Sequence, residues 1–413
     1  MTLSARCSTE KEALHSTRED AKKSSSTIPT PVPIQNCITL RPTMEEFRDE
    51  LAFLSSEAVQ NAGKKCGIVR VVTPKEFDPT RSYTLADANS KPDLWTLQVS
   101  VLEQQFLPIK TRKMIQPGKF MVGRRQDQPY PCGMDEWMEL GERMKRETEE
   151  LMVKRLGVEE AAIPSDMSDG NSARKHFWKS RPYQVCAPYG ADIPQSAMRP
   201  DLTCWNFASD NFPCLTRIFQ TNRTPGVYTP YLYLGQWGTS FGLHPEDKDL
   251  YSLNYLHEGD QVLWYGIPST NSQDVEQFAA ELLPNEAKAC DQFLRHKTLL
   301  VEPRFFAERG IPIFAAEQKA RDLMITFPNA YHYGFNNGFN VAESRNIATP
   351  DWLEIGLKAK QCTCKTYRAP DVLPRHRILE MAKQCDAYKY LTVPHHPSSV
   401  VESTERVKKS RRM

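Results

Sequence analysis

The sequence predicts a mainly β protein with additional helices, in which a double-sheet jelly roll is the largest unit. Between residues 177 and 349 the chain is rich in aromatic residues and in short strand-like runs, with one helical interruption at about 274–297. The clearest runs are residues 228–234, 250–256, 261–267 and 323–328. Short runs at this spacing are typical of a double-sheet jelly roll. The 30 prolines and 7 tryptophans also favour turns and an aromatic core over a helical bundle.

A small α/β unit is predicted before the jelly roll. Residues 1–36 are polar, rich in Ser, Thr, Lys and Pro, and expected to be disordered. Thr43 and Glu46 then form a capping box before apolar residues at helical spacing, and Gly63 is expected to end that helix. Residues 68–72 predict a short strand. A unit of this size cannot hold a core alone, so we expect it to pack on a larger one.

The elements between this unit and the jelly roll are less regular. Residues 78–131 are expected to be irregular, and a helix is predicted at 135–156, ended by Gly157. Residues 161–174 have the composition of a flexible insertion. After the jelly roll, Thr349 and the proline that follows it predict the start of a helix that reaches residue 361.

Composition excludes several classes of protein. The chain has 413 residues, 40 % hydrophobic and 25 % charged, and a net charge of only +2. It has no apolar run long enough to span a membrane, no signal peptide, and no basic helix or zinc-finger array for sequence-specific DNA binding. Eleven cysteines without a secretory signal indicate reduced thiols, some of them metal ligands. The basic residues 406–413 are either a nuclear-import signal or a solvated chain end.

A first group of candidate metal ligands consists of His244, Glu246 and, much later, His332. Residues i and i+2 of a strand point the same way, so His244 and Glu246 can approach one ion, and a later strand can add His332. Two imidazoles and one carboxylate on one face of an octahedron suit a non-haem Fe(II) oxygenase. An isolated His-x-Glu pair is a weak signal, because most such pairs lie on protein surfaces without a metal.

Longer motifs carry a resemblance to a known family. The segments YTPYLYLGQWGTSFGLHPEDKDLYSLNYLHEGD, FLRHK, MITFPNAYHYGFNNGFNVAES and CTC closely resemble the JmjC histone lysine demethylases. The match is nearest to the subfamily that acts on trimethylated histone H3 at its ninth and thirty-sixth lysines. ITLRPTMEEFRDEL is similar to the JmjN segment of those proteins. The resemblance covers roughly residues 37–79 and 177–367.

This resemblance implies roles for individual residues. It makes His244, Glu246 and His332 the iron ligands, with Lys297 close to the reaction centre and Tyr233 beside the methylated lysine. The positions that match the binding site of the 2-oxoglutarate co-substrate are Tyr189, Asn254, Phe241 and Trp264. The positions that match the binding site of the methylated lysine are Gly226, Tyr233, Ser344 and Arg345.

A second group of ligands consists of Cys290, His296, Cys362 and Cys364. Three thiols and one imidazole give a closed tetrahedral zinc site, which is structural rather than catalytic. The similar demethylases have cysteine and histidine at the same spacings. Such a site would tie the helical interruption to the segment after the jelly roll.

Three positions depart from the family pattern. Val262 stands where the family has the lysine that pairs with the distal carboxylate of 2-oxoglutarate. Losing one partner of a buried charge pair weakens binding by about 10²–10⁴-fold. Arg345 replaces a small residue: it either turns towards 2-oxoglutarate and substitutes for the missing cation, or repels the trimethylammonium, or lies exposed to solvent. Pro225 stands where the family can carry an acidic residue, which would alter histone-tail recognition.

The expected organisation is a tail at residues 1–36, JmjN at 37–79, a linker with a helix and an insertion at 80–176, JmjC with the zinc site at 177–367, and a helical, basic tail at 368–413. The resemblance implies a nuclear protein that engages the histone H3 tail, the nucleosome and other chromatin proteins. Two functions stay open. One is an active demethylase that releases formaldehyde and succinate; the other is a weakly active or non-catalytic chromatin regulator.

Overall fold

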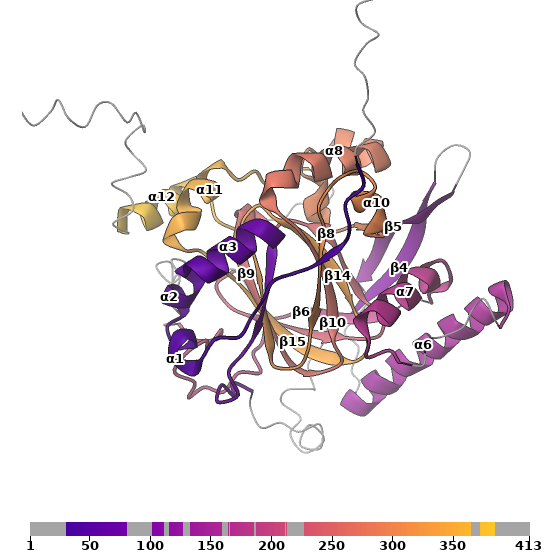
Figure 1. Cartoon of the computed structure of the whole chain (residues 1–413), viewed down its shortest axis with the longest axis horizontal. Coiled ribbons are helices and arrows are strands. Elements are labelled where there is room, and N and C mark those ends of the chain that lie inside the picture. The colour runs from indigo at the N-terminus through magenta and orange to yellow at the C-terminus, as the bar shows by residue number, and fades with distance from the viewer. Residues whose placement is uncertain are drawn as a thin grey trace, which may run out of the picture.

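Two β-sheets, with helices around them, form the body of the protein (Figure 1). The computed structural model describes residues 30–80, 101–110, 115–126, 133–158, 164, 166–185, 187–210, 212, 227–364 and 372–384. Side chains from both sheets line one cavity between them, so the predicted double-sheet jelly roll is confirmed. No helix within these ranges combines the length and apolar character needed to cross a membrane.

The smaller sheet has five strands in the order β1-β12-β10-β14-β8. The bounds are β1 Gln35–Asn36, β12 Phe314–Gln318, β10 Val262–Ile267, β14 Tyr331–Asn336 and β8 Ser240–His244. All neighbours are antiparallel except β1 and β12. Because β1 pairs with β12, the ordered part of the chain begins before Cys37, and the predicted disordered tail is too long by residues 30–36. Residues 1–29 lie outside the described part.

The larger sheet has ten strands in the order β11-β5-β4-β6-β7-β15-β9-β13-β3-β2. Its N-terminal strands are β2 Thr39–Leu40, β3 Ile68–Val72, β4 Val101–Lys110, β5 Ile115–Gln126 and β6 Ala187–Ile193. The others are β7 Tyr231–Gly235, β9 Tyr251–Gly259, β11 Leu299–Val301, β13 Asp322–Thr326 and β15 Asn340–Ile347. Four of these strands match the predicted runs or the predicted N-terminal strand to within a few residues.

The predicted first helix is three helices: α1 Met44–Phe47, α2 Glu50–Ser55 and α3 Glu57–Cys66. The predicted capping box is present, but the side chains of Asp49 and Ser56 each accept a main-chain hydrogen bond and start a new helix. Gly63 does not end α3. The helix ends at Gly67, which has a left-handed φ of 74°. Gly63 instead allows close packing, since a Cβ there would lie 2.0 Å from the Phe327 ring.

The N-terminal unit packs on the jelly roll, as expected. β3 pairs with β13 along its whole length, and buried side chains of α1 to α3 share one core with β9 and β13. That core includes Phe47, Val59, Leu253 and Leu323. The unit has no separate core, because its strands are the edge of the larger sheet.

Two regions expected to lack structure contain regular elements. β4 and β5 form a long antiparallel hairpin inside the stretch predicted to be irregular. α7 (Gly170–Ser180) begins inside the predicted insertion, where the Asp169 side chain accepts hydrogen bonds from the Asn171 and Ser172 amides. The prediction of a helix ended by Gly157 is confirmed by α6 (Met134–Leu156).

The helices of the C-terminal half follow the prediction in outline. The helical interruption is α8 Ser272–Leu282, α9 Pro284–Ala289 and the 3₁₀ turn η6 Phe293–His296. α10 is Arg304–Ala307. After Thr349 a 3₁₀ turn leads into α11 (Leu353–Lys358), which ends before the predicted residue 361, and α12 (Arg375–Gln384) lies beside α11 (Figure 1).

Candidate functional site

The three predicted iron ligands meet where β8 and β14 lie side by side. His244 ends β8, and its Cα pairs with that of His332 in β14. Glu246 lies just after the strand but remains extended, with φ −65° and ψ 154°. One ligand atom from each residue lies within 4.8 Å of the others, and His332 Nε2 is 3.2 Å from the Glu246 carboxylate. The sequence spacing therefore brings all three together.

The protonation states of these residues suit metal binding. Burial lowers the pKa of His244 well below its usual value, and the nearby charges of Lys297 and His332 lower it further. The Nδ1 atom of His244 lies 2.6 Å from the Gly242 carbonyl, which leaves Nε2 as the ligand atom. Burial alone would raise the pKa of Glu246, but the hydrogen bond and charge from His332 lower it. A neutral imidazole and an ionised carboxylate are the forms that bind a metal.

Two residues that sequence reasoning missed hold Glu246 in place. Asn346 Nδ2 donates to Glu246 Oε2 over 3.0 Å. Arg295 donates to the Glu246 carbonyl over 2.5 Å and to Asp249 Oδ1 over 2.7 Å. Asn346 lies two residues after Ser344 in β15, so strand alternation placed both on one face and was the signal available for it. Arg295 lies within the motif FLRHK, but nothing in the sequence assigns it this role.

This donor set fits a divalent iron ion. With metal–ligand distances of about 2.1 Å, neighbouring ligand atoms of an octahedron are about 3 Å apart. The separation of 3.2 Å between His332 and Glu246 is close to that value. The partner of Glu246 Oε2 is Asn346, so the other carboxylate oxygen can bind the ion.

The triad forms part of the wall of a cavity of about 560 Å³ between the two sheets. Nearly all the predicted site residues line it. Those that do are Tyr189, Tyr233, Phe241, His244, Glu246, Asn254, Trp264, Lys297, His332 and Ser344. Gly226, one of the predicted substrate-binding residues, lies outside the described residues, as does Pro225.

The predicted aromatic wall is present beside the triad. The rings of Phe241 and Trp264 are 4.6 Å apart, and Trp264 lies 6.1 Å from the His332 ring. Trp264 Nε1 donates to Gln318 Oε1, and Gln318 Nε2 donates to Asn254 Oδ1 at 3.0 Å. Gln318 is fully buried and orients two of the predicted co-substrate residues. It was missed because nothing in its local sequence distinguishes it.

Acidic and phenolic groups form another part of the cavity wall. The Tyr233 hydroxyl donates to Asp192 Oδ1 over 3.0 Å, and its ring is 6.1 Å from that of Tyr189. Burial and the charge of Asp192 raise the pKa of Tyr233 well above its usual value.

Lys297 has a left-handed φ of 57°, and its carbonyl would be 2.2 Å from a Cβ on residue 242, so glycine is required at Gly242.

Of the three departures from the family pattern, the two at described residues, Val262 and Arg345, lie in different surroundings. Val262 is buried and lines the cavity. Arg345 is 3 % exposed, so the expectation of a solvent-exposed side chain is wrong. Its guanidinium donates to the Phe207 and Ser209 carbonyls at 2.5 and 3.3 Å and lies over the Phe212 ring. Arg345 is absent from the cavity lining, because alternation along β15 turns it away from the face of Ser344.

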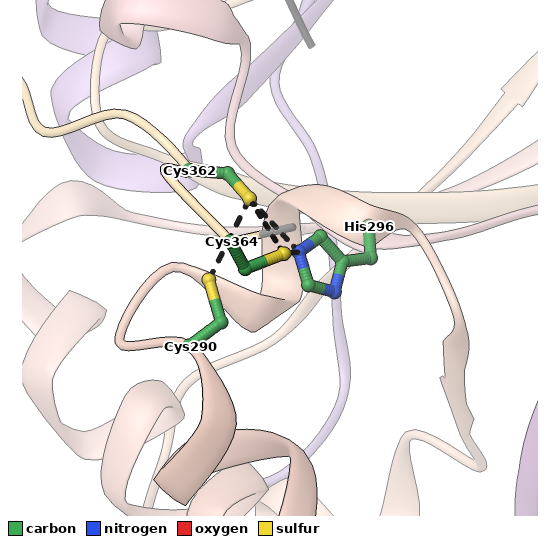
Figure 2. A group of neighbouring side chains, drawn as sticks. All are labelled: Cys290, His296, Cys362 and Cys364. Atoms are coloured by element: carbon green, nitrogen blue, oxygen red, sulfur yellow. Dashed lines mark hydrogen bonds between the residues drawn. The ribbon is translucent and has the colours of Figure 1, made fainter. Parts of the chain in front are cut away.

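The second predicted cluster also assembles (Figure 2). Cys290 follows α9, His296 ends η6, and both thiols of the C-terminal Cys362 and Cys364 turn towards them. Neighbouring sulfur atoms are 3.3 and 3.6 Å apart, and His296 Nε2 lies 3.1 and 3.5 Å from two of them. Zinc bonds of about 2.0–2.3 Å give tetrahedral edges of about 3.3–3.8 Å, so the cluster fits zinc.

A cation that binds this cluster must displace the protons of its thiols. Burial and the neighbouring thiols raise the pKa of Cys362 to about 12, and burial lowers the pKa of His296. A neutral imidazole is a ready ligand, whereas buried thiols become thiolates only when a cation compensates their charge.

Comparisons with known proteins agree with this geometry. The JmjC domain, described as a hydroxylase, matches residues 231–347, and the jmjN domain matches residues 38–73. Lysine-specific demethylase 4B of Mus musculus is 35 % identical over 367 residues, which are 87 % of this chain and 30 % of that protein. Lysine-specific demethylase 4D of Rattus norvegicus is 33 % identical over 341 residues, 81 % of this chain and 59 % of that protein.

A human relative gives the same result. Probable lysine-specific demethylase 4F of Homo sapiens is 32 % identical over 334 residues, 80 % of this chain and 47 % of that protein. The chain thus spans roughly a third to three fifths of these relatives. With a JmjN domain on the edge of its larger sheet and a JmjC domain around the metal-ligand triad, the chain is a JmjN- and JmjC-domain protein homologous to these lysine-specific demethylases.

Proposed function

We propose that this protein is an iron(II)-dependent oxygenase of the demethylase type that receives a methylated lysine of the histone H3 tail. The convergence of His244, Glu246 and His332 on one wall of the inter-sheet cavity carries this proposal. Two imidazoles and one carboxylate leave room for a bidentate co-substrate and O₂. Bound iron(II) would supply the O₂ activation that couples decarboxylation of a 2-oxo acid to hydroxylation of an N-methyl group, from which formaldehyde is lost.

The residues around the triad then have separate tasks. Asn346 orients the carboxylate of Glu246, and the ring of Trp264 forms an apolar wall beside His332. Asn254, held by Gln318, is placed to contact the co-substrate. Lys297 adds a positive charge near the triad.

The part of the cavity near Tyr233 and Asp192 suits a methylated ammonium group. A cation is attracted to aromatic faces and to nearby carboxylates. Tyr233 holds Asp192 through a hydrogen bond, and Ser344 lines the same cavity with its hydroxyl bound to the Leu253 carbonyl. These residues, with Gly226 from outside the described part, are the proposed binding site of the methylated lysine.

We propose that 2-oxoglutarate binds weakly. Tyr189 supplies a neutral hydroxyl, and the buried side chain of Val262 supplies no charge for a distal carboxylate. An unpaired buried charge costs about 3–5 kcal/mol, which corresponds to about 10²–10⁴-fold in affinity. Arg345 does not compensate, since its guanidinium is engaged with Phe207 and Ser209.

The decisive experiment follows methyl loss from histone H3 peptides trimethylated at the ninth or thirty-sixth lysine. The purified chain is incubated with iron(II), ascorbate, O₂ and millimolar 2-oxoglutarate, and products are read by mass spectrometry. Slow loss of methyl groups is expected, abolished in the matched variant His332→Ala. Peptide binding without any methyl loss would contradict the catalytic proposal.

That contrary result would favour a second function, a non-catalytic chromatin regulator that retains the metal site as architecture. The observation that favours it is the uncharged side chain of Val262 in the cavity wall. In either case we propose a nuclear protein that works with other chromatin-associated proteins. A fluorescent fusion tests the location, because exclusion from the nucleus would contradict both functions.

A further inference from the structure

The end of the cavity opposite the triad is placed by the pairing of β10 with β14. Their register sets Gly266 opposite His332 and Val262 opposite Asn336. Four residues along a strand span about 13 Å. Val262 and Asn336, which both line the cavity, therefore mark its far end, while His332 marks the metal end.

Apolar and neutral side chains make up this far end. Val262 is 3 % exposed. Leu102 also lines the cavity. It lies on the same face of β4 as Gln104. The Gln104 side chain forms hydrogen bonds of 2.6 and 2.8 Å with the main chain of Ser240. Across β4 and β6 the partner of Leu102 is Tyr189, which contributes a phenolic hydroxyl.

The amides at this end direct their donors at other groups. Asn336 Nδ2 donates to Thr239 Oγ1 at 2.8 Å and to the Thr239 carbonyl at 3.4 Å. Asn340 Nδ2 donates to Asn336 Oδ1 at 2.9 Å and to the Gly338 carbonyl at 3.4 Å. Each amide nitrogen thus already has two protein acceptors within hydrogen-bond distance.

The positive charge in the cavity lies at the other end. Among the described residues that line the cavity, Lys297 is the only lysine or arginine. Its positive charge lies near His244 and Glu246 of the triad. Asp192 and Asp247 add negative charge to the lining. A ligand carboxylate at the far end would be desolvated without a cationic partner from the described part of the chain, at a cost of several kcal/mol in its affinity.

We propose that this cavity selects a 2-oxo acid with an uncharged aliphatic tail, a 2-oxo monocarboxylate, over the dicarboxylate 2-oxoglutarate. The inference rests on the proposed function, since the 2-oxo acid group chelates the ion held by the triad. At the far end an aliphatic tail is buried against Leu102 and Val262, where apolar contact is favourable. A branched or linear 2-oxo acid of about five or six carbons would supply such a tail.

The test is anaerobic calorimetry on the full chain loaded with Mn(II), which replaces iron(II) without turnover. Mn(II) binding is first measured by itself through loss of its free-ion electron paramagnetic resonance signal. 2-Oxo-4-methylpentanoate, 2-oxopentanoate and 2-oxoglutarate are then titrated separately. We expect each monocarboxylate to bind at least about tenfold more tightly than 2-oxoglutarate, and only when Mn(II) is present.

Variants of Val262 assign the selectivity to this end of the cavity. Val262→Lys is expected to reverse the preference by about 10²-fold or more by pairing with a dicarboxylate. Val262→Thr keeps the shape of the valine side chain, so it remains informative if the lysine variant does not fold. It should weaken the binding of the monocarboxylates by several-fold and leave the binding of 2-oxoglutarate unchanged. The matched control Val275→Thr, equally buried in α8 and away from the cavity, should leave the ratio of affinities unchanged.

Two results overturn the inference while the metal site stands. One is tighter binding of 2-oxoglutarate than of either monocarboxylate; the other is normal Mn(II) binding with no response to any 2-oxo acid. Failure to bind Mn(II) is a different result, because it would overturn the metal site and the proposed function, and the inference with them.

Discussion

At the scale of single residues, Asn346 shows how this site is held together by groups that are not ligands. Its amide hydrogen bond to Glu246 Oε2 directs the other oxygen of that carboxylate towards the two imidazoles. Residues that orient metal ligands in this way typically account for 10–100-fold in metal affinity.

We therefore expect Asn346→Ala to weaken Mn(II) binding by about 10–100-fold, measured by titration calorimetry. Ser344→Ala is the matched control, because Ser344 lies on the same face of β15 but hydrogen-bonds Ser252 and Leu253 instead of a ligand. Equal Mn(II) affinity in the Asn346 variant and the control would show that Glu246 needs no such support.

Arg345 has a structural task at the same scale. Because its buried guanidinium satisfies two main-chain carbonyls, Arg345→Met should lower the free energy of unfolding by about 2–3 kcal/mol in urea titrations. It should leave the affinity for 2-oxo acids unchanged. Arg143→Met, on an arginine whose side chain is 57 % exposed, is the control and should have little effect on stability. A large fall in co-substrate affinity in the Arg345 variant would contradict the assignment of Arg345 to a position outside the cavity.

At the scale of elements, the cysteine–histidine cluster connects two parts of the chain that are far apart in the sequence. Cys290 and His296 come from the helical interruption, and Cys362 and Cys364 from the segment after α11 (Figure 2). With zinc bound, the cluster would fix that segment against α9 and η6.

The expected result of metal analysis is one zinc per chain, with no loss on gel filtration. Cys364→Ser should weaken zinc binding by at least about tenfold and lower the Tm, because it removes one of four ligands. Cys204→Ser, on a buried thiol of the N-terminal core, is the control and should leave the zinc content unchanged. Full zinc occupancy in the Cys364 variant would argue against a four-ligand site.

Elements also show where sequence patterns failed. β4 and β5 lie in the stretch expected to be irregular. Polar residues such as Gln104 and Gln105 interrupt the alternation there, and Pro108 and Pro117 lie within the strands. Gln104 is nevertheless fully buried, since its amide is paired with the main chain of Ser240. A buried polar residue with a distant partner looks like a loop residue in the sequence.

At the scale of the whole molecule, the JmjN unit is a structural part of the JmjC sheet. β3 is continuous with the larger sheet through β13, and Val71 is completely buried in the shared core. The Arg70–Asp322 ion pair at 2.7 Å joins the same two strands. We infer that the two domains unfold together.

Thermal denaturation should accordingly show one transition by circular dichroism and tryptophan fluorescence. Val71→Asp should destabilise the chain by more than about 3 kcal/mol, because it buries an unpaired carboxylate. Val72→Asp, on the opposite and partly exposed face of β3, is the matched control with a smaller effect. Separate transitions for the N-terminal unit and the jelly roll would contradict a common core.

The sequence by itself determined the fold class, the family and both ligand clusters. Local rules were sufficient for β3, α6 and the capping box at Thr43, because strand alternation and helix caps depend on neighbours in the chain. For His244, Glu246 and His332 the spacing was a weak signal by itself, and the resemblance of the surrounding motifs made the assignment.

Only the tertiary structure decided which side chains share the cavity and which leave it. Arg345 and Ser344 are adjacent in the sequence, yet one binds the Phe207 carbonyl and the other lines the cavity. Gln318 and Leu102 reach the site from strands far apart in the chain, so no local pattern marks them. The physical reason is that packing of the two sheets, a property of distant residues, fixes where polar groups find partners and where charge is missing.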